Sequence, residues 1–596
     1  MSTIEKLVTD NIDLWTSAIE KRATQGRGSN SKIKLYGIQK LRELILELAV
    51  RGLLVTQDPK DEPASVLLDK IKKEKERLVK VGKIRKQKVT SAIREDEKLF
   101  MLPDGWVWSR LAEISEANTG YAFKSSEYTE TGTFVLRVTN INPDGSINLF
   151  DNKFIDPEIA STTYEKFSLT EGDVLLVMVG GSLGKIGIVS QECLPAVLNQ
   201  NMWKLDRFGG IENKYFIAGI RFINENQITI TKSTHGHLAQ GAYMEKLFPL
   251  PPLAEQHRIV AKVDELMALC DQLEQQQTDS ITAHQTLVET LLNGLVESAK
   301  SSGSNNKNTS EYFNHLIANH FDTLFTTEHS IDQLKQTILQ LAVMGKLVPQ
   351  DPNDEPASVL LEKISKEKTR LIEKGEIRKE KPLAEITEGE EPFELPGTWE
   401  WTKLEDIVNI TSGITKGRKL AGRKLTTLPY LRVANVQRGF LDLATMKVIE
   451  LPEDEVKKFT VVERDLLITE GGDWDKVGRT AVWRNELPLV AHQNHVFKAR
   501  CISKEQNEIW LEKYLNSEVA RDYFAGSSKQ TTNLASINKT QLRRCFIAIP
   551  PINEQHRIVA KFSELMALCD TLKTRIAKNQ TIQIHLADAI VEQAIG

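Results

Sequence analysis

Cysteine is scarce in this sequence, and the chemistry that it would support is not expected. The five cysteines include no closely spaced pair, so neither a disulfide framework nor a cysteine zinc site is predicted. Cys270 and Cys569 occupy matching positions of a repeat described below, and we interpret them as small apolar core residues. We expect no metal and no cofactor bound by this chain.

Long hydrophobic runs are also missing. No apolar stretch approaches the roughly 18 residues needed to span a bilayer. The first residues, MSTIEKLVTDNIDLW, are polar and acidic, which argues against a signal peptide. With 40% hydrophobic and 27% charged residues, the composition is that of a globular protein, and we predict a cytoplasmic location. At 596 residues the chain is too long for a single core.

An excess of positive charge is absent as well. Lysine and arginine number 77 against 81 aspartates and glutamates, and the formal net charge is −4. Because local lysines and arginines neutralise phosphates, any contact with DNA must come from clusters in an otherwise balanced protein.

Motifs of catalysis are not found. VGGSLGK at Val179 lacks the spacing of a phosphate-binding loop, with Ile186 where Ser or Thr should follow the lysine. DEPAS is not a helicase box, and no Asn/Asp-Pro-Pro-aromatic motif for amino-group methylation occurs. The pairs His235/His237 and His492/His495 have no carboxylate at ligand spacing. We predict no catalytic residues.

What the sequence does contain is a tandem duplication. EQHRIVAKVDELMALCD begins at Glu255 and returns as EQHRIVAKFSELMALCD at Glu554, an offset of 554 − 255 = 299 residues. QDPKDEPASVLLDKIKKEKERL begins at Gln57 and returns as QDPNDEPASVLLEKISKEKTRL at Gln350, an offset of 350 − 57 = 293 residues. The segments between these constant blocks are much less alike.

The constant blocks have helical spacing. Apolar residues from Ile38 to Val50 recur every three or four positions, and Gly52 is a plausible stop, as is Gly345 in the second copy. A turn rich in Asp and Pro follows, and Pro63 starts a helix that continues into a basic tract ending at Lys88. This tract either lies along DNA or an acidic partner, or is simply a solvated helix face.

The divergent inserts alternate β-branched runs with Gly, Asn and Asp, which predicts short strands joined by turns. Each insert opens with a WxW strand whose tryptophans we interpret as core residues. Arg137 and Asn140 repeat as Arg432 and Asn435, which favours a shared structural role.

Long helices follow each insert. Apolar residues at alternating spacings of four and three, such as Ile259, Leu266 and Cys270, and later Leu287, predict a coiled-coil seam, and the matching series after Ile558 includes Leu586. Two like helices pair most simply in an antiparallel manner. The composition of 298–310 predicts a flexible linker between the repeats.

These features predict an α+β fold with two sheet-containing domains separated by long antiparallel coiled-coil helices and related by an internal pseudo-twofold repeat. The expected domains are an N-terminal helical region (1–101), a first variable domain (102–250), a central helical region (251–394), a second variable domain (395–549) and a C-terminal spacer helix (550–596).

Two variable domains, each followed by PPxxEQxxIVxxxxxL and a long helix, resemble the specificity (S) subunit of type I restriction–modification systems across essentially the whole chain. The ELAVRG…QDPxDEPAS element is most similar to the IB (EcoA-like) group. The resemblance implies a non-catalytic DNA reader, in which each variable domain, called a target recognition domain, binds half of a split site. It also implies two methyltransferase (M) subunits, restriction (R) subunits, and S-adenosylmethionine, ATP and magnesium on those partners.

Candidate DNA-binding residues lie in polar loops flanked by glycine, because base edges are read by hydrogen bonds while phosphate contacts fix register. In the first variable domain they are Tyr121, Lys124, Ser182, Lys185, Asn199, Gln200, His237 and Gln240. In the second they are Lys416, Arg418, Lys419, Arg423, Lys424, Asp473, Trp474, Lys476, Gln493, Asn494, Lys529, Gln530 and Asn533. The four amides Asn199, Gln200, Gln493 and Asn494 either read adenine or close strand ends.

Two other functions are compatible with the pattern. A coiled-coil scaffold without DNA specificity would need the helices and not the loops. A stand-alone DNA-modifying enzyme would need catalytic motifs that we do not find.

Overall fold

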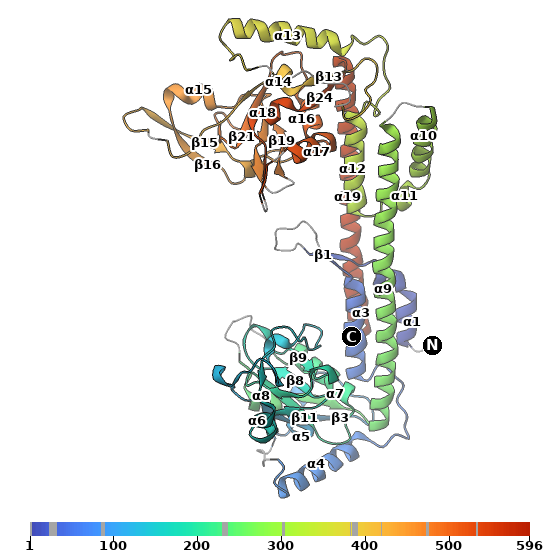
Figure 1. The fold of residues 1–596 in the computed structure, drawn as a ribbon. Coiled ribbons are helices and arrows are strands. Elements are labelled where there is room, and N and C mark those ends of the chain that lie inside the picture. Colours follow the sequence, from blue (N-terminus) through green and yellow to red (C-terminus); the bar gives the residue numbers. More distant parts are fainter. Residues whose placement is uncertain are drawn as a thin grey trace. The chain divides into compact units, whose positions relative to one another are not determined.

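A computed structural model describes residues 3–22, 32–84, 90–228, 237–300, 304–381, 383, 391–418, 420–472, 476–527, 529–531 and 534–595. The chain divides into two compact units. The first comprises Met1–Thr278 and Gln580–Gly596, and the second comprises Asp279–Asn579. Each unit contains one variable domain and a set of helices (Figure 1).

The helices of the first unit are α1 (Thr3–Asp10), α2 (Ile12–Ser17), α3 (Tyr36–Arg51), α4 (Ala64–Lys80), α5 (Leu111–Ile114), α6 (Pro157–Thr162), α7 (Asn213–Asn226), α8 (Gln240–Met244), the first part of α9 (Leu253–Ala299) and the last part of α19 (Ile552–Ile595). Its strands are β1 (Glu20–Arg22), β2 (Lys32–Lys34), β3 (Val107–Arg110), β4 (Ser115–Thr119), β5 (Thr133–Leu136), β6 (Phe154–Ile155), β7 (Ser168–Leu169), β8 (Val174–Val177), β9 (Ile186–Ile188), β10 (Ala196–Leu198), β11 (Met202–Arg207) and β12 (Leu247–Leu250).

The helices of the second unit are α10 (Ser304–Asn319), α11 (Phe321–Leu324), α12 (Glu328–Val343), α13 (Ala357–Glu373), α14 (Leu404–Ile407), α15 (Val456–Phe459), α16 (Glu508–Asn516), α17 (Glu518–Ser527) and α18 (Lys539–Arg544), with the remaining parts of α9 and α19. Its strands are β13 (Glu400–Lys403), β14 (Val408–Thr411), β15 (Leu425–Leu431), β16 (Lys447–Pro452), β17 (Leu466–Thr469), β18 (Gly471–Gly472), β19 (Thr480–Val482), β20 (Ala491–His492), β21 (Val496–Cys501), β22 (Lys529–Thr531), β23 (Leu534–Ser536) and β24 (Phe546–Ile549).

The two variable domains share one sheet topology. The first has a four-stranded sheet of order β4-β11-β8-β9, and the second has β14-β21-β17-β19 in the same order. All neighbours in both sheets are antiparallel. A second sheet, β6-β5-β10-β7 or β16-β15-β20, accompanies each. The prediction of two α+β domains is therefore confirmed.

Contacts between the constant blocks explain why these blocks repeat together. In the first unit Gln57 donates to Glu255 (3.2 Å) and Arg258 to Asp61 (2.7 Å). In the second unit Gln350 donates to Glu554 (2.6 Å), and Arg557 to Asp354 (2.6 Å). Burial raises the pKa of Glu255 and of Glu554, so these carboxylates depend on their hydrogen-bond partners. Loss of Gln57 or Gln350 would leave the buried Glu255 or Glu554 without this hydrogen bond.

The helix directions in the first unit follow from its contacts. The Tyr36 hydroxyl donates to Asp588 (2.7 Å), and Arg51, at the other end of α3, contacts the Ile595 carbonyl (3.5 Å), so α19 runs parallel to α3. Arg42 pairs with Asp271 (2.7 Å), whereas Glu255 lies beside Gln57 beyond the end of α3, so α9 runs the opposite way. The segments of α9 and α19 in this unit are antiparallel, as predicted.

The seam departs from the predicted spacing in the later part of each long helix. Leu287 is 50% exposed and Leu586 is 49% exposed, whereas Val288 and Ala587 are buried. A straight helix drifts by about 20° per heptad against a 3.5-residue repeat, so the buried stripe moves to the next residue after the polar middle segment. The predictions for Leu287 and Leu586 as core residues were wrong.

Two further elements differ from expectation. The basic helix α4 ends at Lys80 rather than continuing through the basic tract, and residues 85–89 lie outside the described part of the chain. The segment predicted as a linker is helical for much of its length, because α9 continues to Ala299 and α10 begins at Ser304. The ring of Phe313 on α10 packs against Gly294, which gives this polar helix an apolar anchor.

Candidate nucleic-acid interface

One edge of the four-stranded sheet gathers the candidate loops of the first variable domain. Thr119, the last residue of β4, pairs with Trp203, and Val177, the last residue of β8, pairs with Met202 at the start of β11. The loops after β4 and β8 and the loop before β11 therefore meet at the same edge. They carry six of the candidate residues, namely Tyr121, Lys124, Ser182, Lys185, Asn199 and Gln200.

A backbone bridge joins two of these loops. Tyr121 and Asn199 form an isolated parallel bridge, and the Tyr121 amide donates to the Leu198 carbonyl (2.9 Å). Gly120 permits this approach, since a Cβ there would lie 2.3 Å from the Asn199 carbonyl oxygen. Asn199 is half-buried and Gln200 is exposed, so Gln200 is the more accessible of the two amides.

Tyr121 belongs to an aromatic cluster. Its ring centroid lies 4.6 Å from that of Tyr164, 5.1 Å from Phe123 and 5.4 Å from Phe167. These contacts give its ring a structural role at the base of the loop. Lys124, three residues later, is exposed.

A second loop pair lies beside the first. Val179 and His237 form an antiparallel bridge, which brings the Ser182–Lys185 loop to the segment before α8. Lys185 Nζ donates to the Ile141 carbonyl (3.0 Å), and Gln240 Nε2 donates to the Ala117 carbonyl (2.5 Å). Lys185 and Gln240 thus hold the loops together, while His237 is exposed.

The second variable domain repeats this edge with different side chains. Thr469 at the end of β17 pairs with Val496 at the start of β21, and Ile414 bridges Gln493 as Tyr121 bridges Asn199. A Cβ on Gly413 would lie 2.2 Å from the His492 carbonyl oxygen, so this close approach also depends on glycine. The Asn494 amide donates to the Ile414 carbonyl (2.9 Å).

The basic loop of this domain, residues 414–424, is paired with an acidic turn. Arg418 donates to Glu455 (2.7 Å), Arg423 donates to both Glu455 and Asp454 (2.7 and 2.6 Å), and Lys424 lies 3.0 Å from Glu453. Lys416 Nζ lies 5.2 Å from the ring centroid of Tyr430. We predicted cations available to phosphates, and sequence reasoning missed Glu453, Asp454 and Glu455.

A third loop lies beside a short ribbon. Strand β18 pairs with β23, and β23 pairs with β22, so Gly471 and Gly472 lie near the backbone of Lys529 and Gln530. Lys419, Asp473, Trp474 and Asn533, and the side chains of Lys529 and Gln530, lie outside the described residues.

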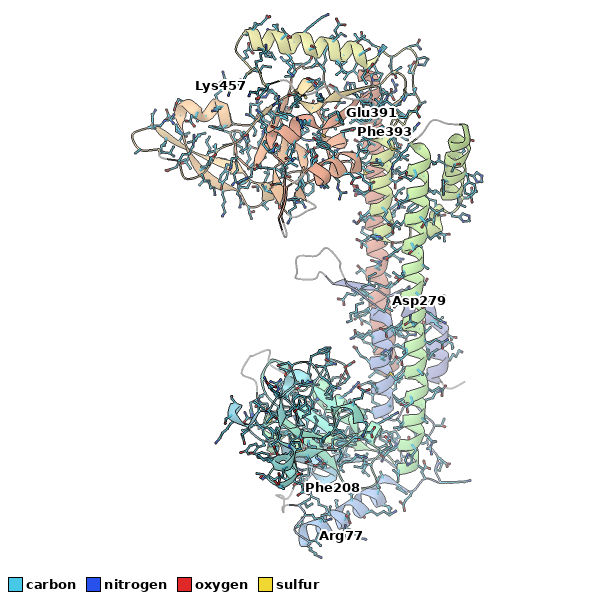
Figure 2. The ribbon with its side chains drawn as sticks, in the orientation of Figure 1. Arg77, Phe208, Asp279, Glu391, Phe393 and Lys457 are labelled. Atoms are coloured by element: carbon cyan, nitrogen blue, oxygen red, sulfur yellow. The ribbon has the colours of Figure 1, made fainter. Side chains whose placement is uncertain are left out.

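Two lysines that the sequence did not suggest border the basic loop. Lys457 (Figure 2) and Lys458 on α15 are exposed. Lys458 Nζ lies 5.1 Å from the Phe459 ring centroid. The guanidinium of Arg418 lies 5.5 Å from the same ring centroid. In the sequence, two adjacent lysines are a weak signal for a DNA contact.

Below the edge lie two buried basic groups. His492 donates through Nδ1–H to the Phe459 carbonyl (2.8 Å), and burial lowers its pKa to about 4. Lys498 donates to the Thr460 carbonyl (2.9 Å), and burial lowers its pKa to about 8. Both side chains stabilise the strand ends from inside the domain, and neither is accessible to a ligand.

The repeated residues Arg137 and Arg432 have a structural role, as predicted. The guanidinium of Arg137 donates to Asp151 (2.9 Å), and that of Arg432 donates to the Thr445 carbonyl (2.9 Å). The backbone amides of the same arginines donate to the side chains of Asn140 and Asn435 (3.0 Å each). Both asparagines are buried.

The basic constant helices lie away from this edge. On α4, Lys70 pairs with Glu62 (2.6 Å) and Arg77 with Glu74 (2.7 Å), and Arg77 is labelled in Figure 2. Lys75 Nζ lies 5.5 Å from the Phe208 ring centroid. These intramolecular contacts favour the solvated-face interpretation of the α4 part of the tract.

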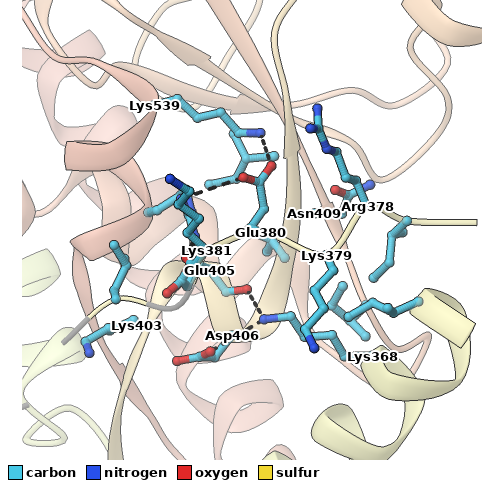
Figure 3. Close-up of a pocket in the computed structure, with 17 residues that line it drawn as sticks. Lys368, Arg378, Lys379, Glu380, Lys381, Lys403, Glu405, Asp406, Asn409 and Lys539 are labelled. Atoms are coloured by element: carbon cyan, nitrogen blue, oxygen red, sulfur yellow. Dashed lines mark hydrogen bonds and ion pairs between the residues drawn. The ribbon is translucent and has the colours of Figure 1, made fainter. Parts of the chain in front are cut away.

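A cavity of about 380 Å³ lies next to α13 in the second unit (Figure 3). Its cations are Lys368, Arg378, Lys379, Lys381, Lys403, Lys539 and Arg543. Lys539 pairs with Glu380 (2.7 Å), and Lys368 donates to the Glu405 carbonyl (2.7 Å). Because Val408, the first residue of β14, lines the cavity, it lies at the opposite end of the strand from the candidate loops.

Within the described part of the chain, no group of three His, Cys, Asp or Glu side chains is placed to hold a metal ion. No helix of that part is long and apolar enough to cross a membrane.

A duplicated α+β domain with different polar side chains on the same sheet edge, carried by near-identical helices, defines a class of binding protein with two recognition modules. Residues 103–283 and 396–582 match the family described as type I restriction modification DNA specificity domain. The chain belongs to this family, the specificity subunits of type I restriction enzymes, which recognise DNA and are not catalytic.

Two specificity subunits are similar to this chain over its full length. The chain is 39% identical to the EcoAI specificity subunit of Escherichia coli and 37% identical to the EcoEI specificity subunit, each over 100% of both chains. The predicted likeness to the EcoA-like group is thereby confirmed. The crystal structure of the HsdS subunit from Thermoanaerobacter tengcongensis is 18% identical and covers 84% of this chain and 98% of that one, with a TM-score of 0.40.

Proposed function

We propose that each variable domain reads one half of a bipartite, asymmetric DNA site through its sheet-edge loops. The observation that carries this proposal is that both domains present loops from equivalent strand ends, with equivalent bridges at Tyr121–Asn199 and Ile414–Gln493, but with different exposed side chains. A shared framework with divergent loops gives two readers of different sequences. Half-sites about one helical turn apart, roughly 34 Å, would be read from one side of the duplex.

The long helices would set the distance between half-sites and hold the partner subunits. Four exposed positions of α9, His257, Ala261, Glu265 and Ala268, are identical to His556, Ala560, Glu564 and Ala567 of α19, and all are exposed. Their spacing places them on one helical face. Packing within the chain does not require identity at exposed positions, and two copies of one partner would favour it. We assign this stripe to two methyltransferase subunits.

The restriction subunits would join the same assembly, which directs adenine methylation or ATP-dependent cleavage in the cytoplasm. S-adenosylmethionine, ATP and magnesium would be bound by the partners.

Domain exchange tests the reading function. Replacing residues 396–548 with the insert of another family member should change one half of the methylated motif and leave the other half unchanged. The measurement is single-molecule methylome sequencing of cells that carry the chain and its methyltransferase partner. A change in both halves would contradict modular reading. No split motif at all, with the partner bound, would favour a scaffold without DNA specificity.

Partner binding has its own test. Ala261→Arg or Ala560→Arg alone should leave one methyltransferase subunit bound, and both together should leave none, as measured by native mass spectrometry. Gln276→Arg, at an exposed position of α9 beyond the repeated block, is the matched control. Two bound subunits in the double variant would remove the stripe as the docking surface.

A further inference from the structure

The acidic turn Glu453–Glu455 lies where strand pairing places it opposite the basic loop. Leu425 at the start of β15 pairs with Pro452 at the end of β16. The residues just before β15 and just after β16 are therefore neighbours, and the Glu453 amide donates to the Lys424 carbonyl (3.0 Å). The pairing of β15 with β16 therefore holds the acidic turn next to the basic loop.

The ion pairs between them are directed and multiple. Arg423 donates Nη1 to Glu455 (2.7 Å) and Nη2 to both oxygens of Asp454 (2.6 and 2.8 Å). Glu455 also accepts from Arg418 (2.7 Å), and the two arginines hold its pKa below the usual value. A carboxylate and a phosphate offer a guanidinium the same kind of acceptor, so the turn occupies the groups that a DNA backbone would contact.

The outer ion pairs are exposed and are not needed for folding. The Asp454 side chain is 73% exposed and that of Glu453 is 45% exposed, whereas Glu455, which pairs with Arg418, is 21% exposed. Exposed ion pairs contribute little stability because water screens both charges. The fold would keep its strand pairing if the acids were neutralised.

We infer that Glu453, Asp454 and Glu455 act as internal competitors for the phosphate backbone and limit sequence-independent DNA binding by the second variable domain. Any duplex that engages Arg418 or Arg423 must first displace a carboxylate. Sequence-independent binding depends almost wholly on such cation–phosphate contacts, so it is the mode that the turn suppresses most. This inference rests on the proposed function of the domain as a DNA reader.

The test compares charge-neutral variants of the full chain in complex with its methyltransferase partner. The triple variant Glu453→Gln, Asp454→Asn, Glu455→Gln is compared with Glu400→Gln, Glu463→Gln, Glu505→Gln. The control removes the same charge from exposed positions, and Glu463 and Glu505 lie just before β17 and just after β21, at the sheet end opposite the loops. Affinity for a duplex that lacks the recognised site is measured by fluorescence anisotropy across a range of salt concentrations.

The triple variant should bind this duplex about tenfold more tightly than the control at low salt. Its slope of log affinity against log salt should steepen by about two, as two freed arginines neutralise two phosphates. Equal affinity and slope in the two triple variants, or weaker binding by the acidic-turn variant, would overturn the inference. Asp454→Asn alone keeps the test available if the triple variant fails to fold, and it should move the slope in the same direction.

Failure of the reading function and failure of the role of the acidic turn give different results. If the unmodified complex shows no preference for any split-site duplex, the proposed reading function is wrong. If the preference is present and the acidic-turn variants match their controls, only the role of the turn is wrong.

Discussion

Substituting one glycine should separate the loops of one recognition domain while leaving the other domain intact. A Cβ on Gly413 would lie 2.2 Å from the His492 carbonyl oxygen and 2.5 Å from that of Gln493. To accommodate Gly413→Ala, the two backbones must move apart by roughly 1 Å, and overpacking of this kind costs about 1–3 kcal/mol. The hydrogen bonds between Ile414 and His492 (2.8 Å) and between Asn494 and Ile414 (2.9 Å) are the contacts at risk.

The displacement changes where the basic loop sits relative to Gln493 and Asn494. If these segments read one half-site together, a loss of about 1.4 kcal/mol of binding energy corresponds to a tenfold weaker affinity. We expect at least that loss for the half-site read by the second domain. Competition binding with duplexes scrambled in one half or the other measures each half-site separately.

Gly526→Ala is the matched control, because a Cβ at Gly526 meets no atom within 4 Å. Gly120→Ala should produce the same defect for the other half-site, since its Cβ would lie 2.3 Å from the Asn199 carbonyl oxygen. Unaltered half-site affinity in Gly413→Ala, with hydrogen exchange showing the bridge disrupted, would refute the assignment of this edge as the reading surface.

Three other predictions address the loop, the core beneath it and the spacer. Arg418→Ala should weaken binding to the recognised split-site duplex and lower the salt slope for that duplex by about 0.9, and an unaltered slope would remove Arg418 from the phosphate footprint. Because the pKa of His492 is lowered from 6.5 to about 4, its contribution to stability is present above pH 6.5 and is lost as the pH falls toward 4. Hydrogen exchange around β20 should show a loss of up to about 3 kcal/mol there, which His492→Asn should abolish. Inserting about one helical turn between Leu273 and Leu291 should change the spacing of the half-sites in the methylome or prevent assembly, and an unchanged spacing would argue against a spacer role.

Local patterns in the sequence predicted much of the scaffold. Helix α3 ends at Arg51, next to Gly52, whose φ of 73° only glycine adopts readily, so the stop signal was physical. Alternating apolar runs predicted a sheet in each variable domain. The exposure of Leu287 could not be predicted from local spacing. A strict heptad count ignores the drift of a straight helix between two packed segments.

The candidate site was harder to predict because its side chains contact residues distant in the sequence or backbone atoms. The sequence predicts Lys185 and Gln240 as DNA contacts from their residue type and their place in polar loops, yet each donates to a main-chain carbonyl that no side-chain pattern reveals. Arg423 and Asp454 are 31 residues apart and meet only because β15 and β16 pair in one register. Residue composition identified the loops, whereas strand pairing determines which of their charges face DNA without competition.

The way in which the loops are held also explains how two copies of one domain can carry different side chains. Both bridges, at Tyr121–Asn199 and Ile414–Gln493, are made by backbone groups, and each requires only that the preceding residue be glycine. The hydrogen bonds of both bridges are made by backbone atoms, so exposed side chains such as Lys124 and Gln200 can change without loss of the bridge, although Tyr121, Lys185 and Gln240 also support the first domain's loops. The constant blocks are the opposite case, because Gln57, Asp61, Glu255 and Arg258 contact one another through side chains and must change together or not at all. A chain built in this way can diverge at its reading edge while its spacer and docking helices stay the same.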